Sequence, residues 1–297
     1  MKIDGVFSGG GIKAFVFIGA LKALEEEGYS FERVAGTSAG ALFASLIVAG
    51  FQSDELEEIF LSLEVDQFLD QSSIGKYFPF VKWITLFSTM GLYKGKRFEK
   101  WVAALLEEKG IHSFGDIESD RLKIIAADIT LNKVVVFPDD LKSNYHIEPS
   151  YFPISRAIRS SVSIPYFFRP TRLSNLLSRK ISVIVDGMIL SNFPLWIFEQ
   201  DKKRPILGMQ LTDPSILSKN VRIDNSVDLL KAMIGTMRRA SDQKYISKNI
   251  ANQILFFPIN NVSGTDFNIS VEKKKELIAT GYNRTKLHLK TFRKNRA

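Results

Sequence analysis

The sequence predicts an α/β fold with a largely parallel central sheet. Short apolar segments typical of buried strands alternate with longer helical patterns along the chain of 297 residues. Hydrophobic residues make up 45% of the chain and charged residues 24%, which is enough apolar material for a sizeable core. No internal repeat, low-complexity tract or linker interrupts the sequence. We therefore expect a single domain over residues 1–297.

The composition also limits the chemistry and the compartment. The chain has no cysteine, which excludes disulfides, thiolate metal sites and a cysteine nucleophile and fits a reducing compartment. Its N-terminus carries no signal-peptide pattern. Its longest weakly charged run, residues 77–93, is broken by Pro79, Lys82 and Gly91. We expect a cytoplasmic protein without a transmembrane helix.

The first strand is expected at Ile3–Phe7, followed by the loop Ser8-Gly9-Gly10-Gly11 and a helix over Ile12–Gly28. The acidic run Glu25-Glu26-Glu27 near the end of this helix is expected to be a solvated face.

The glycine loop fits two functions, of which dinucleotide binding is the first. The pattern Gly9-x-Gly11-x-x-Ala14 matches a dinucleotide fingerprint, which requires an acidic residue at the end of the second strand. That strand ends in Ala35-Gly36-Thr37-Ser38, and Glu32 lies at its beginning, so the sequence disfavours nucleotide binding.

A G-x-S-x-G pentapeptide, Gly36-Thr37-Ser38-Ala39-Gly40, follows a candidate strand at Phe31–Val34 and precedes an apolar stretch without proline that ends at Gly50. A strand, a sharp turn and a helix are the context of a nucleophile elbow, in which a strained serine occupies the helix N-terminus. The pentapeptide alone is common by chance, so its weight depends on the rest of the chain.

With an elbow nearby, the second interpretation of the glycine loop is an oxyanion hole. The N–H groups of Gly9, Gly10 and Gly11 are unshielded by side chains, and with the N–H of Ala39 they can point at one developing oxyanion. Lys13 follows the loop, and three roles are open for it. It fixes the loop, it binds an anionic headgroup of the substrate, or it is an ordinary surface lysine.

The next segment predicts a helical excursion from the fold. Ser53 is expected to be the N-cap of a short acidic helix. Residues 65–96 mix aromatic and basic side chains and predict a helical cap insertion, which either packs on the core or meets a lipid interface as a mobile lid. A helix over Arg97–Lys109 and two strands, Leu122–Asp128 and Lys133–Phe137, are expected next.

A buried strand at Ile181–Val185 ends in Asp186-Gly187-Met188. Open α/β sheets gather functional groups at the ends of their strands, although Asp-Gly after a strand is also a common turn. The other elements expected in this half of the chain are helices over Ser155–Ser161, Ser226–Asn249 and Val271–Leu289 and strands at Pro205–Leu211 and Ile254–Pro258.

Only three histidines are available as the base of a serine hydrolase, namely His112, His146 and His288. None of them lies in a context typical of a catalytic histidine. A chain that is poor in histidine but has a nucleophile elbow favours a Ser-Asp dyad, because a partly buried carboxylate can accept the serine proton.

Four blocks, in this order, resemble the patatin-like phospholipases from Lys2 to about Leu211. They are Gly9-Gly10-Gly11-Ile12-Lys13, Gly36-Thr37-Ser38-Ala39-Gly40, the segment Ser160–Pro170, and Asp186-Gly187-Met188-Ile189-Leu190-Ser191-Asn192-Phe193-Pro194. The resemblance implies a three-layer α/β/α sandwich, lipid acyl hydrolysis without a metal or cofactor, and Ser38 and Asp186 as the catalytic pair. The chain departs from the family at Ala14, usually glycine, and at Met188, often glycine or alanine, which is expected to narrow the substrate pocket.

We therefore predict a cytoplasmic, peripheral-membrane lipid acyl hydrolase of the phospholipase A type that acts on glycerophospholipids through an acyl-enzyme. The net charge is +8, and residues 284–297 hold six Lys or Arg and no acid. This tail is either solvated or attracted to anionic lipid, so we expect a phospholipid or membrane partner and no nucleic acid. A soluble carboxylesterase or thioesterase and a catalytically silent lipid-binding module are the alternatives.

Overall fold

The computed structural model describes residues 1–70, 89–199, 204–212, 223–225, 228–229, 232–233, 235–237, 253–260, 262, 264, 266 and 268–294. Residues 71–88 of the expected cap therefore lie outside the described residues, as does most of the helix expected over Ser226–Asn249. The same holds for residues 295–297 of the basic tail.

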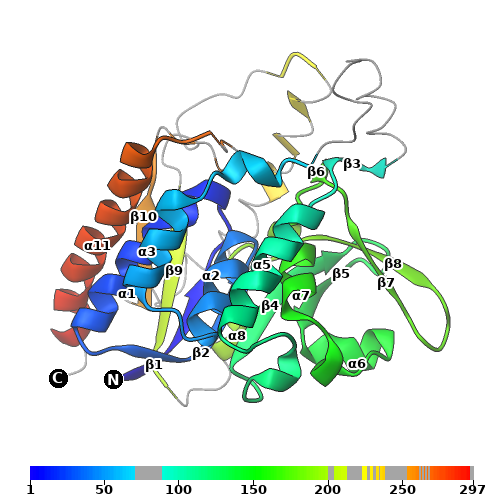
Figure 1. Ribbon diagram of the computed structural model, residues 1–297, viewed down its shortest axis with the longest axis horizontal. Coiled ribbons are helices and arrows are strands. Elements are labelled where there is room, and N and C mark those ends of the chain that lie inside the picture. The colour runs from blue at the N-terminus through cyan, green and yellow to red at the C-terminus, as the bar shows by residue number, and fades with distance from the viewer. Residues whose placement is uncertain are drawn as a thin grey trace.

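An eight-stranded sheet forms the centre of the described structure (Figure 1). Its order is β10-β9-β1-β2-β4-β8-β7, and β5 pairs with β4 beside this path. The strands from β10 to β4 run parallel, whereas β5, β7 and β8 each run antiparallel to their partners. The expected α/β fold with a mostly parallel sheet is confirmed. The strands are β1 Lys2–Phe7, β2 Ser30–Thr37, β4 Leu122–Asp128, β5 Lys133–Phe137, β7 Thr171–Ser174, β8 Ile181–Asp186, β9 Ile206–Thr212 and β10 Ile254–Pro258.

Strand β4 organises the part of the sheet that matters for function. On one edge it pairs with β5 from Ile124 to Asp128. On the opposite edge it pairs first with β2, which ends with Thr37 opposite Ile125, and then with β8, which ends with Asp186 opposite Ala126. Because β2 is parallel and β8 antiparallel to β4, the carboxyl ends of β2 and β8 meet end to end.

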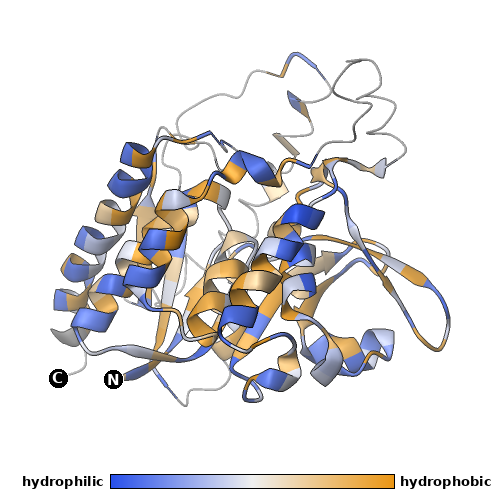
Figure 2. Cartoon of the chain, in the orientation of Figure 1, coloured by the Kyte–Doolittle hydropathy of each residue, from blue (hydrophilic) through white to orange (hydrophobic). Residues whose placement is uncertain are grey.

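Helices cover one face of the sheet, and most of the buried side chains lie there (Figure 1). On that face Ile3 and Phe7 of β1 and Val34 of β2 pack with side chains of the helices. Figure 2 shows apolar residues along α2 and the central strands and many hydrophilic residues along α11. The helices are α1 Val16–Glu26, α2 Ala39–Val48, α3 Ser53–Ser62, α5 Lys96–Glu108, α6 Asp139–Tyr145, α7 Ile154–Ser161, α8 Trp196–Glu199 and α11 Val271–Lys294.

A second, smaller core covers the other face of the sheet. Successive side chains of a strand point to opposite faces, so Val6 and Ala35 turn away from the helices above. They pack with Phe193, Leu195 and Phe198 from the segment that leads into the short helix α8. The sheet therefore lies between two layers, as the three-layer arrangement requires.

Two small features were not expected from the sequence. The helix predicted to begin at Ile12 starts with a 3-10 segment, Gly11–Phe15, before α1. A second sheet pairs β3, Gly91–Tyr93, with β6, Tyr166–Phe168. It joins the end of the expected cap region to the segment between α7 and β7.

The expectation for Ser53 was wrong. The N-cap of α3 is Gln52, because the side chain of Glu55 reaches back to the Gln52 N–H and completes a capping box. Ser53 is instead the first helical residue, and its N–H and hydroxyl donate to the carboxylate of Glu25.

The expectation that the acidic end of α1 is a solvated face was also wrong, because α11 packs against α1 and binds this end. Lys286 of α11 pairs with Glu26 at 2.8 Å and with Glu27 at 2.9 Å. The two helices approach closely at Gly19 and Gly281, where a Cβ atom would lie within 2 Å of a backbone carbonyl oxygen of the opposite helix. Part of the basic tail is thus taken up by the fold. None of the helices in the described ranges is long and apolar enough to cross a bilayer.

Candidate active site

Ser38 lies at the sharp turn between β2 and α2, as the pentapeptide predicts. Its backbone has φ 55° and ψ −125°, a conformation that L residues rarely adopt and that exposes a side chain at the tip of the turn. A Cβ atom at Gly36 would lie 2.4 Å from the carbonyl carbon of Gly40, and one at Gly40 would lie 2.4 Å from the Phe7 oxygen. Both flanking glycines are therefore required for the close approach of strand and helix.

Asp186 ends β8 and faces Ser38 across the junction of the two strands. The Ser38 hydroxyl donates to Oδ2 of Asp186 at 2.7 Å. The other oxygen of Asp186, Oδ1, accepts the N–H of Met188 at 2.9 Å, which fixes the orientation of the carboxylate. Ser38 is 5% exposed and Asp186 fully buried. Two residues that lie 148 positions apart in the chain are thus joined directly.

The end of α7 holds the backbone of both residues in place. The Ser161 hydroxyl accepts the N–H of Ser38 at 2.8 Å and donates to the carbonyl of Ile125 at 2.5 Å. The carbonyl of Ser163 accepts the N–H of Asp186 at 2.9 Å. The family resemblance implies that the segment Ser160–Pro170 lies beside the active site, but the contact of the Ser161 hydroxyl with Ser38 was not expected.

The glycine loop lies against the nucleophile, since a Cβ atom at Gly9 would be 3.1 Å from the Cβ of Ser38. The Gly9 N–H donates to the Asn192 carbonyl at 3.1 Å, so Gly9 does not offer it to an oxyanion as the sequence had suggested. The N–H groups of Gly10, Gly11 and Ala39 have no hydrogen-bond partner among the residues described. The oxyanion hole expected from Gly10, Gly11 and Ala39 stays a prediction.

Lys13 and Met188, the two residues expected to contact substrate, have different surroundings. The Lys13 ammonium is buried and donates to the Ile259 carbonyl after β10 at 3.3 Å, a contact that ties the glycine loop to the sheet. This corresponds to the loop-fixing role; headgroup binding by Lys13 stays a prediction. Met188 is half-buried directly after Asp186, and its effect on the pocket also stays a prediction.

The three histidines take no part in this arrangement. His146 follows α6 in a left-handed conformation, and His288 lies on α11, where burial lowers its pKa. Within the described part of the chain, Ser38 hydrogen-bonds to Asp186 and Ser161 and to no histidine. No group of three His, Asp or Glu side chains among the described residues is arranged to hold a metal ion.

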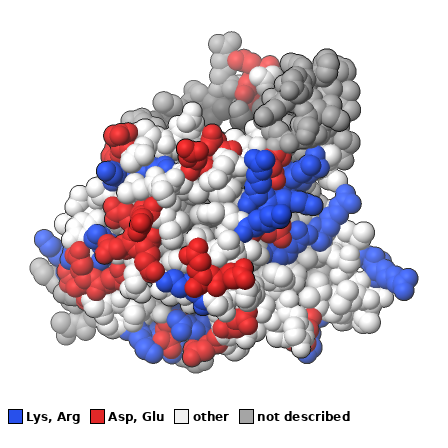
Figure 3. Space-filling model, viewed as in Figure 1, with Lys and Arg blue, Asp and Glu red and all other residues white. Residues whose placement is uncertain are grey.

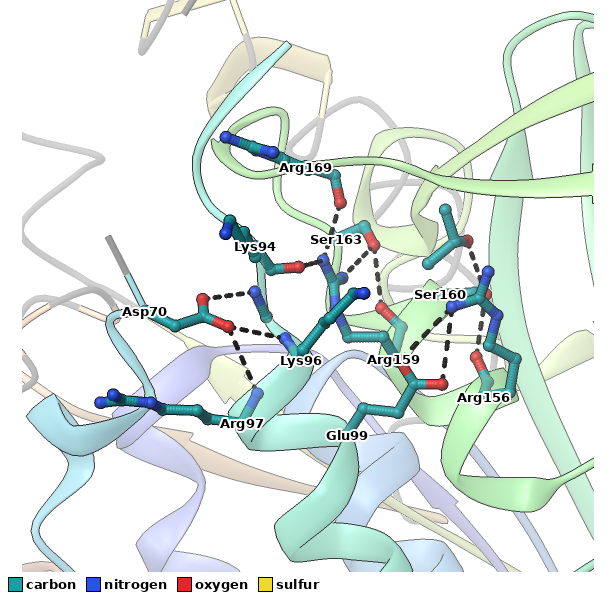
Figure 4. Close-up of polar contacts among 12 residues, drawn as sticks. Asp70, Lys94, Lys96, Arg97, Glu99, Arg156, Arg159, Ser160, Ser163 and Arg169 are labelled. Carbon is teal, nitrogen blue, oxygen red and sulfur yellow. Dashed lines mark hydrogen bonds and ion pairs between the residues drawn. The ribbon is translucent and has the colours of Figure 1, made fainter. Parts of the chain in front are cut away.

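A buried arginine connects the site with the base of the expected cap (Figure 4). Arg159 of α7 donates to the Ser163 hydroxyl at 2.6 Å and to the carbonyls of Lys94 and Arg169 at 2.7 and 2.8 Å. Desolvation lowers the pKa of its guanidinium to about 10. On the other side of this connection, Asp70 accepts the N–H groups of Gly95 and Lys96 at the start of α5, at 2.6 and 2.8 Å.

The arrangement of a serine on a strained turn, a carboxylate in contact with its hydroxyl and three free N–H groups can perform acyl transfer. Comparison with known proteins points in the same direction. The model of the family described as patatin-like phospholipase matches residues 5–199, which include all four sequence blocks.

Known relatives extend the similarity to almost the whole chain. YqhO of Bacillus subtilis, an uncharacterised protein, is 41% identical over 292 residues, covering 98% of this chain and 99% of YqhO. The crystal structure of VipD from Legionella pneumophila is similar with a TM-score of 0.59 and 16% identity, covering 98% of this chain and 67% of VipD. The type III effector ExoU of Pseudomonas aeruginosa gives a TM-score of 0.53 and 16% identity over 98% of this chain and 53% of ExoU. At such identities the two structures establish the fold.

Proposed function

The chain belongs to the patatin-like phospholipase family, and from this premise we propose that it hydrolyses fatty-acyl esters of glycerophospholipids through Ser38 and Asp186. The observation that carries the proposal is the 2.7 Å hydrogen bond from the Ser38 hydroxyl to the buried Asp186 carboxylate. The bond directs the serine proton to a group that can accept it, and the turn leaves Oγ at the tip of the elbow.

The proposed reaction has two steps. Ser38 Oγ attacks the ester carbonyl carbon as its proton passes to Asp186 Oδ2, and the carbonyl oxygen becomes an oxyanion that accepts hydrogen bonds from Gly10, Gly11 and Ala39. The intermediate collapses when the C–O bond to the glycerol oxygen breaks and that oxygen takes the proton from Asp186. In the second step Asp186 removes a proton from water, whose oxygen attacks the acyl carbon. The C–O bond to Ser38 Oγ then breaks, Oγ takes the proton back from Asp186, and the fatty acid leaves.

Labelling with a fluorophosphonate followed by intact-mass analysis tests the nucleophile and the base. We expect one adduct on the wild-type chain, none on Ser38→Ala and strongly slowed labelling of Asp186→Asn. Ser45→Ala is the matched control, because Ser45 is also buried and its hydroxyl bonds to Ala41 within α2. An adduct that persists in Ser38→Ala, or that never forms on folded wild type with or without anionic vesicles, would contradict the proposal.

The substrate class is tested by comparing turnover on phospholipid vesicles with turnover on a dissolved short-chain p-nitrophenyl ester. We propose a peripheral-membrane enzyme of the cytoplasm, so vesicles should be cleaved and should stimulate turnover. Turnover of the dissolved ester without any stimulation by vesicles would favour a carboxylesterase or thioesterase.

A further inference from the structure

Two exposed apolar side chains lie at the starts of the paired strands β3 and β6. Met90 directly precedes β3, and Tyr166 begins β6 opposite Gly91. Their side chains are 39% and 47% exposed, and both residues have a left-handed backbone, with φ of 58° and 63°. Such a conformation is unfavourable for residues other than glycine and persists only where the surroundings impose it. The backbone is thus held in an unfavourable state that turns apolar groups toward solvent.

Four basic residues follow these two apolar residues closely in the chain. Lys94, Lys96 and Arg97 are exposed after β3 and in the first turn of α5, and Arg169 is half-buried directly after β6. None of the four forms an ion pair with a described residue. Figure 3 shows a blue area over α5 and the small sheet, while acidic side chains prevail over α1 and α3. Unlike Lys286 on α11, these four side chains are thus not paired with an acid among the described residues, and the nearby Asp70 carboxylate binds the backbone N–H groups of Lys96 and Arg97 instead.

Hydrogen bonds through Arg159 and Ser163 connect this surface with the Ser38–Asp186 pair. Arg159 binds the carbonyls of Lys94 and Arg169, which lie at the ends of β3 and β6. Figure 4 shows these carbonyls turned toward the guanidinium, while the side chain of Arg169 extends away from it. The same guanidinium binds the Ser163 hydroxyl, and the carbonyl of Ser163 binds the N–H of Asp186.

We propose that the docking face, formed by Met90, Lys94, Lys96, Arg97, Tyr166 and Arg169, binds the surface of an anionic lipid bilayer. Cations attract anionic headgroups, and an exposed aromatic ring is suited to the boundary between headgroups and acyl chains. A nucleic acid would also be attracted by the cations, but the apolar pair and the connection to the acyl-transfer site favour lipid. The choice of lipid rests on the proposed function, whereas the existence of a binding face rests on the exposure, backbone and charge of these residues.

The test measures binding of the full-length protein to vesicles by co-sedimentation. The vesicles contain ether-linked phosphatidylcholine with or without ether-linked phosphatidylglycerol, so no acyl ester is present and hydrolysis cannot affect the result. We expect binding to the anionic vesicles that weakens as salt rises. Each lysine near an anionic surface contributes about a fivefold factor, so Lys94→Gln/Lys96→Gln should lower the partition coefficient by roughly 25-fold.

A matched variant, Lys275→Gln/Lys290→Gln, removes two charges from exposed positions on α11 and should bind like wild type. Tyr166→Asn should weaken binding at high salt as well, because asparagine tolerates a left-handed backbone but lacks the ring. Thermal melts like that of wild type establish that each variant is folded.

Three results would overturn the proposal. One is a loss of binding in the α11 variant but not in Lys94→Gln/Lys96→Gln, which would place the contact on α11. The others are binding to duplex DNA but not to anionic vesicles, and equal binding to neutral and anionic vesicles. Vesicle binding without any fluorophosphonate adduct would support the docking face and refute the proposed hydrolase. A fluorophosphonate adduct without vesicle binding would refute the docking face alone.

Discussion

Ser161→Ala is expected to slow the chemistry of Ser38 although Ser161 contacts no substrate. The substitution leaves the N–H of Ser38 without its 2.8 Å partner in the protein interior. An unpaired buried N–H costs about 1–3 kcal/mol, so the free energy of unfolding should fall by that amount. The lost bond also held the nucleophile's own backbone in its strained conformation. A neutral hydrogen bond is worth about 0.5–1.5 kcal/mol net, which corresponds to roughly a 2- to 13-fold slower reaction.

Ser160→Ala is the matched control for Ser161→Ala, because the two serines are adjacent and have similar surroundings. The Ser160 hydroxyl is also fully buried and also makes two hydrogen bonds, to Thr171 at 2.7 Å and to the Arg156 carbonyl at 2.9 Å. Ser160→Ala should therefore cost similar stability but leave Ser38 undisturbed. The assay is the second-order rate of fluorophosphonate labelling, with chemical denaturation of both variants. Equal labelling rates in the two variants, at similar losses of stability, would refute a positioning role for Ser161.

Three further predictions follow from the same geometry. Gly10→Val keeps the backbone N–H but should displace it, because a Cβ atom at position 10 would lie 2.3 Å from Cδ1 of Leu211. Turnover, measured as kcat beside a thermal melt that shows the protein folded, should fall by about 10²–10³-fold, as for the loss of one oxyanion donor. Gly281→Ala should lower the melting temperature far more than Lys286→Met. A Cβ atom at 281 would lie 1.9 Å from the Val16 oxygen, whereas Lys286→Met removes ion pairs with Glu26 and Glu27, and an ion pair near the surface contributes only about 0–1 kcal/mol to the free energy of unfolding. Burial lowers the pKa of His288, so this side chain binds a proton more readily in the unfolded chain, and the free energy of unfolding should decline as pH falls below about 6.5. Between pH 7 and pH 5, the melting temperature of wild type should therefore fall more than that of His288→Gln.

Three strands could be predicted to the residue, and the other expected strands differ from the structure by one to three residues at an end. Leu122–Asp128, Lys133–Phe137 and Ile254–Pro258 have the bounds that the sequence indicates. The turn at Ser38 was also predictable, because the glycines required for the close approach of strand and helix stand on both sides of it in the sequence. These features depend on neighbours in the chain, which is why the sequence contains them.

The pairing of Ser38 with Asp186 was expected only through the family resemblance, and other features that depend on distant partners were not predicted. The strands β3 and β6 have only three residues each, and their pairing brings together Gly91 and Tyr166, which are separated in the chain by the helices α5, α6 and α7. The N-cap at Gln52 depends on the reach of Glu55, and the contact of Ser53 with Glu25 on the docking of α3 against α1. The single-domain organisation over residues 1–297, the catalytic roles and the cap over 65–96 stay predictions.

The antiparallel direction of β8 explains how a serine and an aspartate can meet without a histidine between them. In an all-parallel sheet, the carboxyl ends of neighbouring strands lie side by side and their side chains reach a shared crevice from the same direction. Here β2 and β8 approach each other along one edge of β4, so Ser38 and Asp186 face each other at 2.7 Å, too close for an intervening imidazole.

The geometry of this junction depends on α7. Its C-terminal end binds the N–H of Ser38 through Ser161, and the N–H of Asp186 is bound by Ser163 just after the helix. One turn of chain before Ser163, Arg159 binds the backbone of the docking face at Lys94 and Arg169. One short helix thus carries the contacts to the docking face and the contacts to both reacting residues. Docking on lipid and the rate of acyl transfer are therefore expected to be coupled through α7.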